Sequence, residues 1–173
     1  MKKFLLVLVA VLLVSTVAHA EYNPLSFKNK EPNGFRCLKW GTELSAIGGM
    51  RVIGEEKEKM LKLCIREGDR LRFGSAKLKE ILYIFWNDKL WAVYMSTSGY
   101  QNAQRLKKAA YKAFGKPYKD PRGERYYWSG KRTEIVLEIL SEAADFALFS
   151  VAISEQREAL PPLLWRGFPD PRL

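Results

Sequence analysis

Histidine is almost missing from this 173-residue sequence, and its only copy, His19, lies in a segment that we expect to be removed. A positively charged start, an apolar run over residues 4–14 and the small residues Ala18 and Ala20 form the pattern of a secretory signal. We predict a signal peptide over 1–20, with cleavage after Ala20. The mature chain would then lack the imidazole that Ser-His-Asp and Cys-His catalysis, His-ligated zinc and histidine proton transfer require.

The sequence also lacks an apolar run long enough to cross a membrane as a helix, which takes about 20 residues. Position 21 is Glu rather than Cys, so the mature chain would carry no thiol for a lipid anchor. We therefore expect no transmembrane segment after cleavage and a soluble protein, either periplasmic or secreted.

Cysteine is scarce, with only Cys37 and Cys64. An even number of cysteines in an oxidising compartment favours a disulfide, and we predict one between these two residues. It would close a loop of about 27 residues, which the chain-entropy model values at roughly 3 kcal/mol. Two buried free thiols are the alternative, because a sequence does not show whether two Cβ atoms face each other. Neither a metal site nor a cofactor is expected.

Motifs of nucleotide-binding loops, nucleophile elbows and zinc proteases are absent, so no catalytic residue is assigned. Glu134 and Glu138 lie four residues apart on one face of a predicted strand, and glycoside hydrolysis uses such a carboxylate pair. In the hairpin expected around Ser129-Gly130, however, Glu134 faces Arg125, and a cross-strand ion pair explains it more simply. A secreted hydrolase that uses a carboxylate pair remains the alternative function.

About 150 mature residues suit one globular domain with its own core. Pro-rich stretches lie at both ends, so we divide the mature chain into an N-terminal arm (21–34), a single globular domain (35–160) and a C-terminal tail (161–173).

Strand patterns dominate the domain, and successive strands are joined by turns. Strands are predicted at 35–40, 60–66, 70–73, 80–86, 89–95, 125–128, 132–140 and 145–153, and helices directly after Thr42, at 100–114 and at 155–160. The fold class is therefore α+β: an antiparallel sheet built of hairpins with helices packed mainly on one face. Asn87-Asp88 predicts a type I′ turn that pairs Phe85 with Leu90 and Tyr83 with Ala92.

Positive charge is concentrated in one part of the sequence. Without Lys2 and Lys3 the mature chain has 27 of the 29 Lys and Arg against 19 Asp and Glu, a net charge of +8. Residues 105–132 alone hold ten basic and two acidic residues, together with three adjacent aromatic residues. We predict an anion- or partner-binding surface made of Arg105, Lys108, Lys112, Lys116, Lys119, Arg122, Tyr126, Trp128, Lys131 and Arg132.

The alternative reading of this segment is a solvated basic face with the aromatic residues in the core. The expected partners are an envelope protein or an anionic envelope polymer or lipid surface. Nucleic acid is not expected, because no recognised binding motif accompanies the charge.

Two short sequences carry a resemblance to known proteins: FRCLKWGT at 35–42 and AFGKP at 113–117. Over residues 35–153 the chain resembles a group of small exported bacterial proteins of unassigned function. Its layout is also similar to small envelope domains such as the outer-membrane assembly lipoprotein BamE and secreted β-lactamase inhibitor proteins. This resemblance implies binding to another protein and brings no catalytic residues. The favoured function is therefore an exported, soluble, non-enzymatic binding protein.

Overall fold

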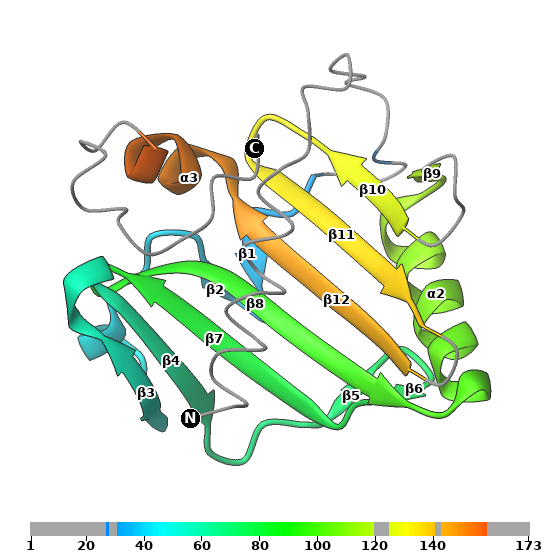
Figure 1. The fold of residues 1–173 in the computed structure, drawn as a ribbon, viewed down its shortest axis with the longest axis horizontal. Coiled ribbons are helices and arrows are strands. Elements are labelled where there is room, and N and C mark those ends of the chain that lie inside the picture. Colours follow the sequence, from blue (N-terminus) through cyan, green and yellow to red (C-terminus); the bar gives the residue numbers. More distant parts are fainter. Residues whose placement is uncertain (1–26, 28–30, 120–124, 141–142, 159–173) are drawn as a thin grey trace.

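The structure is a computed structural model that describes residues 27, 31–119, 125–140 and 143–158. Its main feature is an eight-stranded sheet in which all neighbouring strands are antiparallel (Figure 1). Across the sheet the strands are β3 (Met50–Glu56), β4 (Leu61–Arg66), β7 (Glu80–Trp86), β8 (Lys89–Ser98), β12 (Ala143–Ser150), β11 (Thr133–Ile139), β10 (Arg125–Ser129) and β9 (Tyr118–Lys119).

Two small hairpins lie outside this sheet: β1 (Gly34–Phe35) pairs with β2 (Leu38–Lys39), and β5 (Arg72–Phe73) pairs with β6 (Ala76–Lys77). The helices are the short 3₁₀ turns η1 (Leu44–Ala46) and η2 (Lys57–Lys59) and the α-helices α2 (Tyr100–Phe114) and α3 (Val151–Glu158). The fold is thus dominated by its antiparallel sheet.

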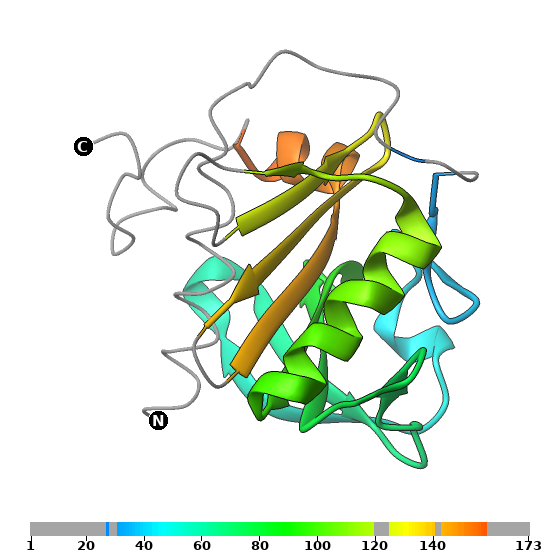
Figure 2. The same ribbon diagram turned by 90° about the vertical axis from the view of Figure 1, so that its right-hand side faces the viewer.

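The sheet has an apolar core on each face, because side chains alternate between the two faces. On the first face Ala103, Leu106 and Ala110 of α2 are fully buried, and Figure 2 shows this helix lying in front of the sheet. On the second face, Ile153 of α3 is buried among the core residues. The predicted antiparallel sheet of hairpins is therefore confirmed, but the two α-helices pack on opposite faces rather than mainly on one.

The β7–β8 hairpin forms the centre of the sheet. Asn87 and Asp88 have φ angles of 49° and 58°, as the predicted type I′ turn requires, and Phe85 pairs with Leu90 as predicted. Beyond this pair Trp91 is an extra residue in β8, and Tyr83 therefore lies opposite Val93 instead of Ala92. The bulge shifts the register by one residue, which the turn alone could not reveal.

Residues 35–40 do not form the predicted strand, because the chain reverses at Arg36 and Cys37, whose φ angles are 48° and 68°. The Arg36 guanidinium forms an ion pair with Asp69 and donates hydrogen bonds to the carbonyl oxygens of Arg70 (2.7 Å) and Arg72 (2.6 Å). These contacts, to residues far along the chain, hold the tight β1–β2 hairpin in place.

The predicted disulfide is wrong, since both cysteines are free. Cys37 lies in the β1–β2 turn and is exposed, whereas Cys64 lies in the middle of β4 and is fully buried in the first-face core. Because Cys37 is exposed in a turn and Cys64 is enclosed in the core, their sulfur atoms do not face each other as a disulfide requires.

Other elements also differ from the prediction: β6 and β9 were not predicted, and the strand expected at 70–73 is only β5 (Arg72–Phe73). β3 was not predicted, because the charged residues Arg51, Glu55 and Glu56 interrupt the apolar alternation by which a strand is recognised. As an edge strand, β3 tolerates such charges. The helix after Thr42 is only the turn η1, and the Thr42 hydroxyl donates back to the Lys39 carbonyl (2.8 Å) instead of capping it. The last strand ends at Ser150, where α3 begins.

The described part of the N-terminal arm packs against the turn between β10 and β11. The Glu31 carboxylate accepts hydrogen bonds from the backbone N–H groups of Arg132 (2.5 Å) and Thr133 (2.8 Å). The buried Thr133 hydroxyl donates to the Pro32 carbonyl (2.6 Å) and accepts from the Trp40 indole N–H (2.7 Å). The predicted signal peptide, His19 and the C-terminal tail lie outside the described residues.

Candidate functional site

The outward side of α2 carries a row of cations. Arg105, Lys108 and Lys112 are all exposed, and at 100° per residue their side chains fall within about 60° of one another around the helix axis. The buried residues Leu106 and Ala110 lie on the opposite side, against the first face of the sheet. The apolar periodicity that docks the helix therefore also directs these cations into solvent.

This row has no acidic neighbours along the chain. Residues 100–119 contain six Lys and Arg and no Asp or Glu, so α2 has no i,i+4 ion pair that could neutralise its cations. Gly115 ends the helix with a φ of 94°, and Lys116 and Lys119 follow it as exposed residues.

The β5–β6 hairpin adds a second acid-free segment beside this row. Residues 70–79 contain four Lys and Arg and no Asp or Glu. Asn102 of α2 binds the backbone of Lys77 on both sides, accepting from its N–H (2.9 Å) and donating to its carbonyl. At the hairpin turn, a Cβ on Gly74 would come within 2.7 Å of the Ala109 Cβ, so only glycine allows this close approach to the helix.

These two segments form one surface, which we call the basic surface. Its members are exposed cations from both segments: Arg70, Arg72, Lys77, Lys79, Arg105, Lys108, Lys112, Lys116 and Lys119. The ion pairs found among the described residues are Arg36–Asp69, Lys59–Glu56, Lys62–Asp88, Arg125–Glu138 and Arg132–Glu31, and no cation of the basic surface takes part in them.

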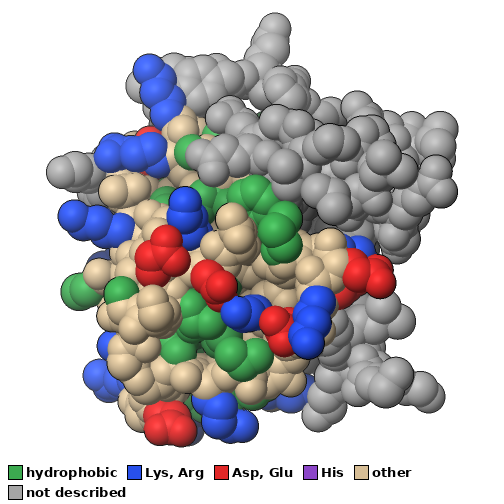
Figure 3. All heavy atoms as spheres, turned by 90° about the vertical axis from the view of Figure 1, so that its left-hand side faces the viewer, with side chains coloured by type: hydrophobic (Ala, Val, Ile, Leu, Met, Phe, Trp, Pro, Cys, Tyr) green, Lys and Arg blue, Asp and Glu red, His purple; other side chains and the backbone are tan. Residues whose placement is uncertain are grey.

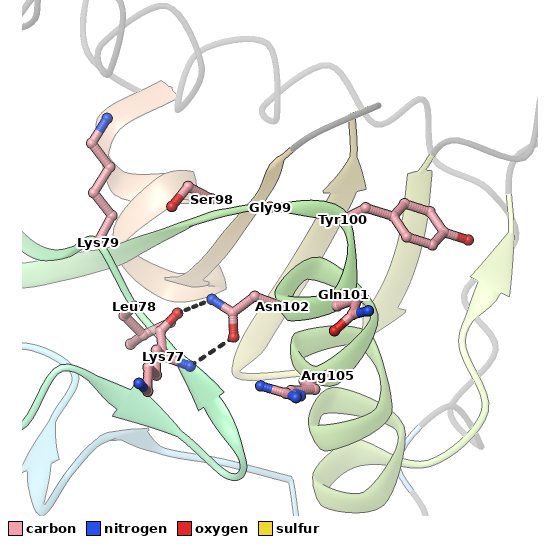
Figure 4. A pocket seen from close by; sticks show the side chains of 9 residues that line it. All are labelled: Lys77, Leu78, Lys79, Ser98, Gly99, Tyr100, Gln101, Asn102 and Arg105. Carbon is pink, nitrogen blue, oxygen red and sulfur yellow. Dashed lines mark hydrogen bonds between the residues drawn. The ribbon is translucent and has the colours of Figure 1, made fainter.

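A hollow of about 560 Å³ lies where the two segments meet, at the start of α2 (Figure 4). Lys77, Lys79 and Arg105 line it together with Ser98, Gly99, Tyr100, Gln101, Leu78 and Asn102. Lys77 and Arg105 lie on the same side of the Asn102 amide, whereas the Lys79 side chain extends away from them. The lining contains no carboxylate, so its charged groups favour an anionic ligand.

The aromatic residues predicted for the binding surface belong to the core instead. Trp128 is fully buried, and its indole N–H donates to the Gly115 carbonyl (2.9 Å) at the end of α2. Tyr126 is 5% exposed, and its hydroxyl accepts from the Lys107 ammonium (2.8 Å), which also lies 4.5 Å from the ring centroid. Alternation along β10 turns both rings toward α2, so neither can stack on a ligand.

The remaining predicted cations are not among those of the basic surface. Lys131 and Arg132 are exposed in the β10–β11 turn, where Arg132 is paired with Glu31 at 3.7 Å. Arg122 lies outside the described residues. The structure thus brings together Arg105, Lys108, Lys112, Lys116 and Lys119, and it assigns Tyr126 and Trp128 to packing.

Sequence reasoning missed two parts of the surface. The first is the β5–β6 hairpin, whose signal was the absence of any acidic residue between Asp69 and Glu80. The second is Tyr118, which is 57% exposed and lies 6.2 Å from the Tyr127 ring between centroids. Lys119 next to it lies 5.9 Å from the Tyr126 ring centroid, a distance at which a cation and a ring attract.

The side of the molecule that carries β3 has a different charge pattern. Figure 3 shows Lys and Arg side chains interspersed there with Asp and Glu side chains. In β4 and its surroundings, Lys62 pairs with Asp88 (2.6 Å) and Lys59 pairs with Glu56. Unbalanced positive charge is thus a property of the α2 side and not of the described surface as a whole.

Carboxylates gather on the second face. The strand register places Arg125, Glu138, Asp145, Ser96 and Glu80 opposite one another in neighbouring strands. Arg125 pairs with Glu138 (3.0 Å), so the prediction that Glu134 faces Arg125 is wrong; the turn spans residues 130–132 and Glu134 lies opposite Ser129. Burial raises the pKa of Asp145, partly opposed by the hydrogen bond that it accepts from the Tyr94 hydroxyl (2.6 Å).

Two absences hold for the described residues alone. No group of three or more His, Cys, Asp or Glu side chains is arranged to hold a metal ion within them. None of the helices in this part of the chain has the length and hydrophobicity needed to cross a membrane.

Comparisons with known proteins leave the geometry as the basis for function. No protein-family model matches the chain, and neither the search of curated proteins nor the search of solved structures finds a match.

Proposed function

We propose that this is an exported, soluble, non-enzymatic protein that binds an anionic component of the cell envelope through its basic surface. The observation that carries the proposal is the docking of one acid-free segment, residues 70–79, against another, residues 100–119. The apolar signal segment at 4–14 supports export.

The energetics of the surface favour an anionic partner. Arg105, Lys108 and Lys112 on α2 are three or four residues apart, about 4.5–6 Å along the axis, which is less than the Debye length of about 8 Å at physiological ionic strength. Their repulsion is therefore only partly screened in the free protein. An anionic partner relieves this repulsion and releases counterions, so binding is strongest at low salt.

Charge reversal tests the proposal. In the variant Arg105→Glu/Lys108→Glu/Lys112→Glu we expect binding to anionic envelope extracts and to vesicles rich in phosphatidylglycerol to fall. At about 1 kcal/mol per cation the loss is at least roughly a hundredfold in Kd. The matched control is Lys39→Glu/Lys57→Glu/Lys89→Glu, which changes net charge equally at exposed positions away from the basic surface.

The control separates local from global charge effects. If both triple variants lose binding to the same extent, net charge rather than the basic surface governs it. If neither loses binding, the surface assignment is wrong. Circular dichroism of both variants establishes that the fold is retained.

A secreted hydrolase is the second candidate. Glu138 and Asp145 lie directly opposite each other on β11 and β12, and Arg125 pairs with Glu138 while burial raises the pKa of Asp145. Two neighbouring carboxyls in different environments are the pattern of acid–base catalysis. A screen with glycan and ester substrates, repeated with Glu138→Gln and Asp145→Asn, decides this: turnover that either substitution abolishes would displace the binding proposal.

A further inference from the structure

The cations of α2 lie in a line rather than in a broad patch. Arg105, Lys108, Lys112 and Lys116 follow one another at intervals of three or four residues. With a rise of 1.5 Å per residue, the three cations on the helix are about 4.5–6 Å apart along its axis and span about 10 Å, and Lys116 follows just beyond the helix end at Phe114. At the Arg105 end, the row meets the cation-lined hollow beside Lys77.

A flat membrane surface fits this row poorly. Helices that bind membranes insert an apolar face beside their basic one. The apolar side of α2 is already occupied, because Ala103, Leu106 and Ala110 are fully buried against the sheet. Among the described residues of 100–119, large exposed apolar side chains occur only at the two ends, at Tyr100 and Tyr118, and residues 70–79 add the single exposed Leu71.

A globular protein partner also fits poorly. Stable protein interfaces have a desolvated core of aromatic and aliphatic side chains inside a polar rim. Between its two terminal tyrosines the row exposes cations and polar groups, and the rings that could anchor a partner, Tyr126 and Trp128, are buried. Single-stranded nucleic acid would likewise find stacking rings only at the two ends of the row, at Tyr100 and Tyr118, and none between them.

We infer that the ligand is a linear polymer with one oxyanion, a phosphodiester or a carboxylate, in each repeat, and that it lies along α2. This inference rests on the proposed function and deepens it. Each repeat places its anion near one cation of the row from Arg105 to Lys116, and one end of the polymer places an anion in the hollow between Arg105 and Lys77. Three helix cations at spacings of about 4.5–6 Å, followed by Lys116 just beyond the helix end, accommodate about four anions.

Oligomers of defined length test this geometry. The probes are oligogalacturonates and oligo(glycerol phosphates), from dimer to dodecamer, with titration followed by calorimetry at several salt concentrations. We expect affinity to rise with each repeat up to about the tetramer or pentamer and then to level off. With about 0.7 counterions released per contact, four contacts give a slope of about −3 for log K against log salt.

Two variants sharpen the test. Lys112→Gln should reduce the magnitude of the salt slope by about 0.7, whereas Lys57→Gln should leave it unchanged. The quadruple variant Lys108→Gln/Lys112→Gln/Val52→Lys/Ile53→Lys keeps the net charge but moves two cations to exposed positions of β3. We expect it to lose the dependence on oligomer length.

The possible failures of the inference and of the proposed function are distinct. Binding in which dimer and dodecamer have equal affinity, or binding to phosphatidylglycerol vesicles without binding to either oligomer series, would overturn the linear polymer and leave the proposed function in place. An absence of binding to both oligomer series and to the vesicles would overturn both. Binding that the charge-relocated variant retains in full would overturn the row as the binding element.

Discussion

Trp128 separates the two interpretations of the aromatic residues, because a core residue and a ligand-stacking residue respond differently to the same substitution. Its ring is fully buried and lies about 6 Å between centroids from Tyr111 (5.9 Å), Phe114 (6.0 Å) and Phe146 (6.4 Å). Its indole N–H donates to the Gly115 carbonyl at the end of α2. We predict that Trp128→Phe destabilises the fold and leaves the basic surface intact.

The expected loss has two parts. Removing the indole N–H leaves the buried Gly115 carbonyl without this donor, which costs about 1–3 kcal/mol. The smaller phenyl ring leaves unfilled volume among three other rings, which costs about 1 kcal/mol more. The free energy of unfolding should therefore fall by about 2–4 kcal/mol.

Urea denaturation measures this loss. With a slope of about 2 kcal/mol per molar urea, a loss of about 3 kcal/mol lowers the midpoint by about 1.5 M. Tyr118→Phe is the matched control, because this ring is 57% exposed and the substitution should change stability by less than about 0.5 kcal/mol. An unchanged midpoint for Trp128→Phe, combined with weaker binding to anionic probes, would refute the assignment of Trp128 to the core.

Three other predictions concern buried or exposed single groups. Because burial raises the folded-state pKa of Asp145, its contribution to stability is full below about pH 4 and is lost as the pH rises through the raised pKa. Asp145→Asn keeps an acceptor for the Tyr94 hydroxyl, so the free energy of unfolding of this variant, measured with urea, should improve relative to that of the wild type from acid to neutral pH. A difference in unfolding free energy that does not change with pH would contradict this. The exposed Cys37 should react with iodoacetamide in the folded protein, whereas the buried Cys64, whose pKa is raised to about 11 mainly by desolvation, should react only after unfolding. Mass spectrometry measures this labelling, and equal labelling of the two residues, or a disulfide between them, would contradict the structure. Thr133→Val removes two hydrogen bonds of a fully buried hydroxyl and should lower the unfolding free energy by about 2 kcal/mol, whereas Thr133→Ser should retain most of it; equal midpoints for the two variants would argue against these bonds.

Local patterns in the sequence were sufficient for the elements that local interactions determine. Asn87-Asp88 predicted its turn because few other residue pairs tolerate positive φ at both positions. The helix at 100–114 was predicted with its observed bounds, because an apolar face repeats through it and Gly115 ends it.

The failures arise where distant residues decide the local conformation. The alternating residues 35–40 suggested a strand, yet the contacts of Arg36 with Asp69 and its neighbours favour a reversal of the chain. The bulge at Trp91 and the longer turn at residues 130–132 shifted two registers, since neither extra residue has a distinctive composition. The predicted disulfide failed with the strand that was to carry Cys37.

For the candidate site, sequence reasoning identified the cations of α2 but assigned the wrong aromatic residues to them. Period-two alternation shows that Tyr126 and Trp128 share a face of β10, but it does not show which face a helix will cover. Only the docking of α2 decides that these two rings are buried. Charge concentration is visible in a sequence, whereas the burial of neighbouring rings is a property of the tertiary structure.

The docking of the β5–β6 hairpin beside α2 shows why the basic surface needs an explanation beyond solubility. Two like charges about 6 Å apart in water repel each other by roughly 0.7 kcal/mol, so the row of cations along α2 carries an electrostatic cost. Specific packing offsets that cost: Asn102 binds the Lys77 backbone, Gly74 permits contact with Ala109, and the Phe73 ring stacks on Phe114 with centroids 6.1 Å apart. A surface needed only for solubility could intersperse acids among these cations and avoid the repulsion, as the β3 side does with Lys62 and Asp88. This contrast between the two sides of the molecule is the physical reason for our proposal that a partner supplies negative charge to the basic surface.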